Sequence, residues 1–234
     1  MIDLASAKAL LVIVGTAALL NGCGVNSTGE TRKETVSFDL DDSKSVRVTL
    51  RMGGGELNVT SGTAKLVEAD FSYNVPEWKP VVEYKAGGGE LSLSQPGYSA
   101  SFGNSVNTWA VNLNKSVPID ITANIGAGEA TLELGDMNLS RVDLNIGAGE
   151  MTVDLRGEPK RDYTVRILGG VGQTTVHLPK DVAISATATK GIGDISIEGL
   201  DERNGVWVNP DRIGAPVTVR VDVKGGVGQI NLKR

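Results

Sequence analysis

The sequence predicts an all-β protein in which short strands stack as a β-solenoid with Gly-x-Gly corners. Three observations support this prediction: glycine-rich steps recur along the chain, the residues beside each step alternate between apolar and polar, and no sustained 3.6-residue pattern follows residue 34. Around one step, Val142, Leu144 and Ile146 precede the glycines, and Val153 and Leu155 follow them. A period of two gives each strand one buried face and one wet face.

The repeated unit is a glycine-rich step followed by an acidic or amide residue. Residues 124–129 and 145–150 are identical copies of it. Glycine at two positions of three suits a corner at positive φ, or backbones that stack too closely for a Cβ atom. Each rung is too small to bury its own apolar face, so we expect stability to come from neighbouring rungs. The seven steps begin at Gly53, Gly87, Gly126, Gly147, Gly170, Gly191 and Gly226.

A second architecture fits the same pattern. Antiparallel hairpins packed as a β-sandwich would also alternate with period two and would use Gly-x-Gly as the turn between strands. The sequence favours the stacked solenoid and leaves the antiparallel sandwich as the alternative.

The N-terminal segment has the pattern of a bacterial lipoprotein signal peptide. Ala9 to Leu20 is an apolar run of the length of a signal-peptide core, shorter than the roughly 20 residues that span a bilayer. It ends in Leu20-Asn21-Gly22-Cys23, which resembles the lipobox, and Cys23 is the sole cysteine. We therefore predict a helical signal peptide over residues 1–22 and lipidation of Cys23. An ordinary secretory cleavage site is the alternative.

The remainder divides into three predicted parts. Residues 23–34 are polar and rich in glycine and serine, which predicts a flexible tether. Residues 35–115, with widely spaced glycine steps, form a predicted N-terminal β domain, and residues 116–234, with tighter steps, form a predicted repeat domain. Residues 200–216 interrupt the last rung as an insertion.

Several classes of function are excluded by composition. The net charge is −5 and the basic residues are dispersed, so nucleic acid is not an expected partner. His177 is the only histidine, which argues against hydrolytic triads and histidine-based zinc sites. None of the glycine steps matches a dinucleotide or P-loop motif. We therefore expect no cofactor, no metal and no catalytic residues.

Two sets of residues are candidates for a ligand surface. Glu129, Glu150 and Asp194 follow glycine steps and would form a row if the rungs stack in register, which could hold calcium. The favoured interpretation is structural, with each carboxylate capping the amides of its corner. Trp78 and Trp109, with Trp207 and Tyr98, could stack against sugar rings, although scattered tryptophans are more often packing anchors.

The motifs at 50–59, 66–74 and 78–80 resemble the toast-rack proteins of the bacterial envelope, which have an N-terminal toast-rack domain followed by a Gly-x-Gly β-repeat region. The C-terminal rungs are similar to adhesin-like repeats and to the C-terminal domain of cell-wall-active antibiotic response proteins. The resemblance covers roughly residues 35–234 and implies the fold and an envelope location. It implies no reaction and no catalytic residues.

These observations predict a non-enzymatic binding or scaffold module, held by lipid at the outer face of the cytoplasmic membrane or at an outer membrane. Its expected partner is an envelope protein or a cell-wall glycan, in adhesion or in an envelope stress response. A polysaccharide-acting β-helical enzyme is the alternative, because stacked carboxylates could reach the roughly 5 to 9 Å separation that glycoside cleavage requires.

Overall fold

The computed structural model describes residues 28–96 and 104–234. The all-β prediction is confirmed, since strands dominate the described residues and two 3-10 turns, η1 (Pro76–Trp78) and η2 (Pro210–Arg212), accompany them. The predicted signal peptide and Cys23 lie outside the described residues. Among the residues that are described, no helix has the length and apolarity needed to span a bilayer.

Six long strands form the body of the molecule, and seven short strands lie at its two ends. The long strands are β2 (Val46–Ser61), β7 (Ile119–Glu133), β8 (Leu139–Asp154), β9 (Tyr163–His177), β10 (Ala183–Glu198) and β13 (Thr218–Lys233). The short strands are β1 (Arg32–Phe38), β3 (Val67–Tyr73), β4 (Val81–Lys85), β5 (Glu90–Ser94), β6 (Asn107–Leu113), β11 (Asp201–Arg203) and β12 (Val206–Val208).

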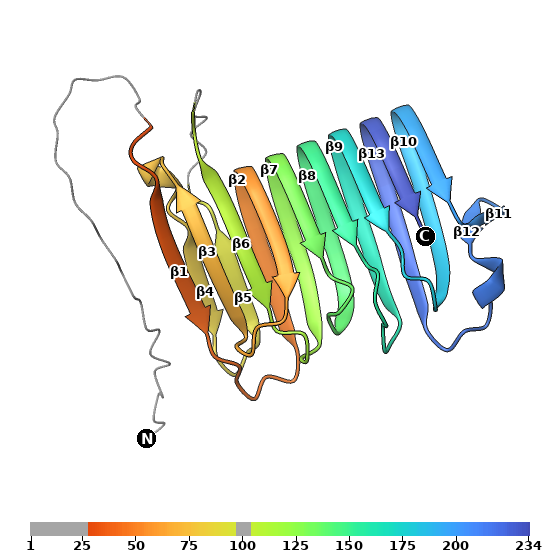
Figure 1. Cartoon of the computed structure of the whole chain (residues 1–234), viewed down its shortest axis with the longest axis horizontal. Coiled ribbons are helices and arrows are strands. Elements are labelled where there is room, and N and C mark those ends of the chain that lie inside the picture. Colours follow the sequence, from red (N-terminus) through yellow and green to blue (C-terminus); the bar gives the residue numbers. More distant parts are fainter. Residues whose placement is uncertain (1–27, 97–103) are drawn as a thin grey trace.

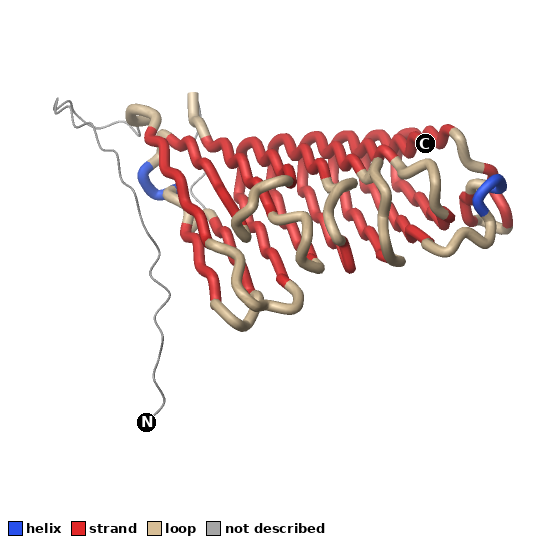
Figure 2. Tube along the Cα trace, turned by 60° about the horizontal axis from the view of Figure 1, so that its bottom comes forward, coloured by secondary structure: helices blue, strands red, loops and turns tan. Residues whose placement is uncertain are grey.

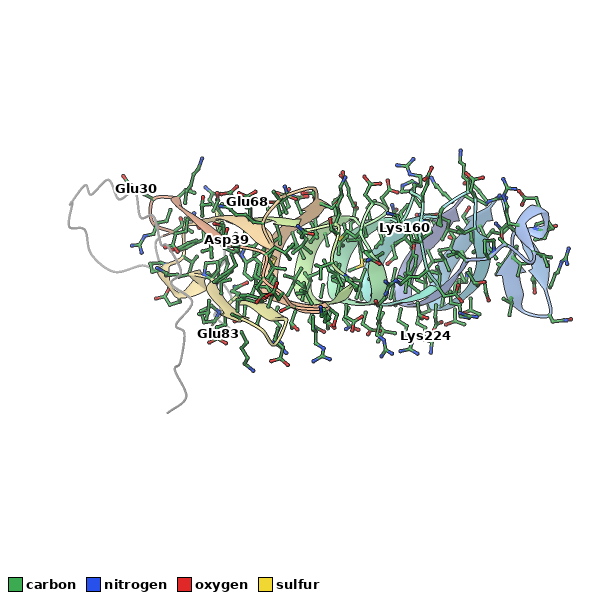
Figure 3. All side chains as sticks on the ribbon, turned by 90° about the horizontal axis from the view of Figure 1, so that it is seen from below. Glu30, Asp39, Glu68, Glu83, Lys160 and Lys224 are labelled. Carbon is green, nitrogen blue, oxygen red and sulfur yellow. The ribbon has the colours of Figure 1, made fainter. Side chains whose placement is uncertain are left out.

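Each long strand bends at its Gly-x-Gly step. We call the residues before the bend the first limb and those after it the second limb. Figure 2 shows the bends following one another along one long edge, and Figure 3 shows the two limbs as two layers with side chains filled in between them. Glu68 and Glu83, on β3 and β4, mark the outer faces of the opposite layers. One aliphatic core runs between the layers along the whole stack.

The long strands pair in parallel and in register, in the order β2-β7-β8-β9-β13-β10 (Figure 1). Loops 134–138, 155–162 and 178–182 return the chain from one rung to the next. The stacked solenoid prediction is therefore confirmed, and the antiparallel sandwich does not describe these rungs. One sheet crosses the predicted domain boundary at 115–116, because β2 pairs with β7.

The end of the stack nearer the N-terminus, the proximal end, is closed by short strands. β5 pairs with the first limb of β2 and β6 with the second limb, and β3 and β1 extend the second layer in antiparallel pairing. Two sequence predictions are corrected here. The Gly87-Gly88-Gly89 step is the turn of the antiparallel β4–β5 hairpin and no rung corner, and β1 begins at Arg32, inside the predicted tether.

The distal end, beyond β13, carries β10 as the last long strand. The predicted insertion folds back on it as a β11–β12 hairpin followed by η2 (Figure 1). β12 pairs with the first limb of β10 at Ser185 and Ala186 only. Asn209 is buried beside them: its Nδ2 donates to the Val182 carbonyl at 2.7 Å, and the Ile184 amide donates to its Oδ1 at 2.8 Å.

Candidate binding surface

The bends require glycine for two independent reasons. The last glycine of each bend has a positive φ, for example +131° at Gly128 and +128° at Gly149, which L side chains rarely adopt. A Cβ atom built on Gly128 would also stand 1.9 Å from the carbonyl oxygen of Gly55 on the neighbouring strand. The first glycine also lacks space for a side chain, with 2.3 Å between a Cβ on Gly126 and the oxygen of Gly53. Both reasons predicted for the repeat are therefore present.

The residues that follow the glycines lie side by side across six strands. We call them the bend row, and all of its members are exposed. Adjacent members are separated by the strand spacing of about 4.8 Å. Acidic residues occupy the proximal half, amides follow, and one acid lies at the distal end. In spatial order the bend row is Glu56, Glu129, Glu150, Gln173, Gln229 and Asp194.

The bend row gives no support to a calcium site. Over residues 28–96 and 104–234, no group of three or more histidine, cysteine or acidic side chains has a geometry that could hold a metal ion. The structure also does not bear out the expected capping role. In the described chain, Glu129 and Glu150 make no hydrogen bond to the bend amides. The backbone pairing of β7 with β8 continues through the bend on both sides of the first glycine. The carboxylates point to solvent.

The middle residues of the bends form a second line, which we call the bend ridge. In spatial order the bend ridge is Gly54, Ala127, Ala148, Val171, Val227 and Ile192, so its side chains grow toward the distal end. Val171, Val227 and Ile192 are 57%, 47% and 73% exposed. Single exposed apolar residues are common on protein surfaces, but three on adjacent strands form a contiguous apolar strip. The repeat pattern alone did not predict this strip, although the three residues are the middle residues of equivalent Gly-x-Gly steps.

The tryptophans do not contribute a sugar-stacking surface. Trp109 is fully buried, where it packs edge-on against Phe71 with 5.3 Å between ring centroids and donates from Nε1 to Asn107. Trp78, in η1, is also buried. Trp207 lies on β12 against the core, half-buried. Trp78 and Trp109 are therefore packing anchors at the proximal end, and Tyr98 lies outside the described residues.

A shallow hollow of about 640 Å³ lies among the return loops, away from the bends. Its walls carry charges of both signs, including Lys115, Asp136, Glu158 and Lys160. Tyr163 also lines it, and burial raises the pKa of the Tyr163 phenol well above its ordinary value. A phenol that stays protonated supplies neither a base nor a nucleophile at neutral pH.

His177 lies on the second limb of β9, half-buried, in register with Asp154 of β8 and Lys233 of β13. Asp154 pairs with Arg156, which holds the pKa of its carboxyl below the usual range. The histidine is therefore one of a row of strand residues on adjacent strands, as expected for a residue without a catalytic or metal-binding role.

The fold and its bends define the class of this protein as a β-solenoid with a glycine-bend edge. The sequence matches the family model for the N-terminal domain of toast_rack over residues 27–177. This match covers more than half of the chain, so the protein belongs to the toast-rack family, as the sequence resemblance implied.

The chain is similar to solved structures. The crystal structure of a candidate cell adhesion protein from Clostridium sporogenes is 31% identical with a TM-score of 0.84, and the match covers 87% of this chain and 99% of that chain. A candidate adhesin from Parabacteroides distasonis is 14% identical with a TM-score of 0.35, over 86% of this chain and 97% of that chain. No curated protein matches the sequence.

Proposed function

We propose that this protein is a non-enzymatic binding module of the bacterial cell envelope, anchored by lipid on Cys23. It presents the bend surface, which comprises the bend row and the bend ridge, to a protein or cell-wall partner. Membership of the toast-rack family and the likeness to a candidate cell adhesion protein support an extracytoplasmic binding role. The lipobox pattern supports the anchor.

One observation carries this proposal: the exposed apolar strip of Val171, Val227 and Ile192 beside the polar bend row. The strip lies on a backbone held by parallel pairing on both sides, so a partner meets a preformed surface and little ordering entropy opposes binding. Binding by stacked rungs is spread over several neighbouring repeats.

The polysaccharide-acting alternative receives no specific support. Glycosidase carboxylates flank a sugar that is bound between them. Glu129 and Glu150 instead follow one another along the outer side of a bend, and the hollow among the return loops does not include them. Polysaccharide turnover that Glu129→Gln or Glu150→Gln abolishes would overturn the binding proposal.

A pulldown from detergent-solubilised envelope and from isolated cell wall tests the binding role. The bait is the mature chain with Cys23→Ser, compared with the triple variant Val171→Ser, Val227→Ser and Ile192→Ser. We expect the triple variant to lose the captured partner. The matched control, Glu158→Ser with Lys160→Ser on the return-loop side, should retain it. Equal capture by all three proteins would count against the bend ridge as the binding surface.

Cell fractionation tests the anchor. Cys23→Ser removes the thiol that is acylated, so we expect the variant to leave the membrane fraction and to appear folded in the soluble extracytoplasmic fraction. The mature wild-type protein should require detergent for extraction. A Cys23→Ser protein that still requires detergent would show that attachment does not depend on lipid at this residue.

A further inference from the structure

The two limbs of β10, at the distal end of the stack, differ in how their outer edge is covered. The first limb is paired with β12, and its inward residues Ile184 and Ala186 are 2% and 0% exposed. The second limb, residues 194–198, pairs with β13 on its inner side. In the described part of the chain, no strand pairs with the outer side of this second limb.

The core is also open at this point. Ile195 and Ile197 of β10 pack against the core but remain half-buried. Their register partners one strand inward, Ile230 and Leu232 of β13, are 2% and 0% exposed. One more strand beside β10 would therefore complete the burial of Ile195 and Ile197.

The backbone of β10 offers hydrogen-bonding groups to such a strand. The Glu198 carbonyl accepts from the Arg234 amide at 3.2 Å, so it faces β13. Peptide groups alternate in direction along a strand, which turns the amides and carbonyls of Ile195 and Ile197 toward the free edge. The Lys190 ammonium donates a hydrogen bond to the Gly193 carbonyl. The stretch of β10 without a hydrogen-bonding partner on its outer side therefore begins after Gly193.

This edge lacks several of the features that protect edge strands. Edge strands are often protected by proline, a bulge or an inward-pointing charge, and residues 194–198, Asp-Ile-Ser-Ile-Glu, have no proline and only isoleucine facing inward. The charges at this edge are outward-facing Asp194 and Glu198, with Lys190 at the bend. The proximal end is different. There, Gln95 accepts from the Gly53 amide at 2.9 Å and Asn107 donates to the Gly54 carbonyl at 2.6 Å, so side-chain amides cover the last bend.

We propose that the second limb of β10 binds an extended segment of a partner polypeptide by β-strand addition, with aliphatic residues facing Ile195 and Ile197 and basic residues facing Asp194 and Glu198. Both acids are exposed on the outer face of the edge. Opposite charges across adjacent strands stabilise pairing and like charges oppose it. This inference rests on the proposed binding function and names its partner class.

A second copy of this chain fits the edge less well. Antiparallel pairing of two β10 strands centred on Ser196 matches the isoleucine faces but sets Asp194 opposite Glu198 of the partner subunit. The chain does contain the basic-aliphatic pattern, at Arg47–Arg51 and Arg220–Lys224, but both segments lie in paired inner strands. We therefore commit the proposal to a segment of a different protein, and a second copy of this chain is an outcome that the test distinguishes.

Fluorescence anisotropy with a labelled synthetic peptide tests the proposal. The probe is a ten-residue peptide that alternates lysine or threonine with valine, added to the mature chain carrying Cys23→Ser. We expect saturable binding, which N-methylation of the peptide's edge-facing amides abolishes and N-methylation of the amides on its other side does not. In hydrogen exchange, the bound peptide should slow exchange at Ile195 and Ile197.

Protein variants locate the site. Glu198→Lys should weaken binding about tenfold, because it sets like charges together. The matched control is Glu133→Lys, which lies at the same level of the rung on β7, four strands and about 20 Å away, beyond the screening length. It should bind as the wild type does. Ile197→Pro should abolish binding, and the fold should survive because the lost N–H faces the free edge.

Three results would overturn the inference: equal binding by Glu198→Lys and Glu133→Lys, protection that appears away from β10, or a concentration-dependent dimer that Ile197→Pro disrupts. The two proposals fail separately. If envelope capture persists in Ile197→Pro, the strand-addition site is wrong and the binding module remains. If the peptide binds β10 but no envelope partner is captured, the strand-addition site is supported and the proposed function is wrong.

Discussion

At the scale of single residues, the bend glycines combine a conformational and a steric requirement. The bend φ values, for example +131° at Gly128, lie beyond the left-handed helical region that asparagine and aspartate visit, so any side chain is strained there. The second requirement is harder to meet, because the space for a Cβ is already occupied by a backbone carbonyl of the neighbouring rung. A side chain at this position therefore separates two strands, and the damage extends beyond its own residue.

Gly128→Val and Ala127→Val test this distinction. The valine at 128 meets the Gly55 oxygen at 1.9 Å and a φ of +131°, so we expect a loss of about 3 kcal/mol or more in the free energy of unfolding. Ala127 is exposed on the bend ridge, where other rungs carry valine or isoleucine, and its replacement should cost less than about 0.5 kcal/mol. Urea unfolding measures both. Similar small losses would show that the bends do not need glycine.

Asp41 gives the structure a pH dependence. The Ser43 hydroxyl, with the Gly87 and Ser43 amides and the Tyr84 hydroxyl, holds the pKa of Asp41 well below its usual range. The unfolded state therefore takes up a proton near pH 3.9 while the folded state does not, and this stabilisation is lost as the pH falls below that value. We expect Asp41→Asn to be less stable than the wild type at pH 7, with the difference shrinking toward pH 2. A difference independent of pH would contradict this assignment.

At the scale of elements, six of the seven glycine steps are rung corners, as the sequence predicts. The seventh, Gly87 to Gly89, has the same composition but φ values of +73° and +61° at its outer glycines, typical of a tight turn. Glycine content does not distinguish a hairpin turn from a bend within a strand, because both need positive φ. The burial of Trp78 and Trp109 agrees with the favoured expectation that they are packing anchors, but their neighbours depend on which strands close the proximal end.

Asn209 is one of the contacts that attach the distal hairpin to the stack, beside the β12–β10 pairing and the Arg234–Asp211 ion pair. This side chain is 1% exposed, and it bonds both the Val182 carbonyl, just before β10, and the Ile184 amide at the start of β10. Asn209→Ala leaves these two buried groups without partners, so we expect a loss of about 2 to 4 kcal/mol in the free energy of unfolding. Ser196→Ala, on the exposed face of the same strand, is the control. A thermal melt unchanged by Asn209→Ala would mean that water replaces the amide.

At the scale of the whole molecule, chain order and spatial order disagree at both ends. β6 and β7 are consecutive in the chain, but β2 lies between them in the sheet. β9 and β10 are also consecutive in the chain, and the later strand β13 lies between them in the sheet. The sequence could not show this, because the rungs share one pattern and any of them could neighbour any other in register. The C-terminal strand is therefore an interior strand of the stack.

Truncation of residues 218–234 tests the consequence of this order. The truncation removes five fully buried side chains, each worth about 2 kcal/mol, so the loss of about 10 kcal/mol rivals the whole stability of a typical domain. Removal of β1 takes away only half-buried apolar residues, Val36 and Phe38, and should cost about 2 to 4 kcal/mol. The five side chains lost with β13 are Val219, Val221, Val223, Ile230 and Leu232.

Hydrogen exchange on the two truncated proteins distinguishes an interior strand from an end strand. Without β13, both β9 and β10 lose a parallel partner, so we expect their amides to exchange rapidly even if β7 and β8 remain protected. Without β1, protection should fall in β3 and stay unchanged from β7 onward, because repeats transmit stability mainly to their neighbours. If β9 stays protected after β13 is removed, β10 has moved inward to pair with β9. The matching register of the rungs permits this pairing, although the observed strand order does not require it.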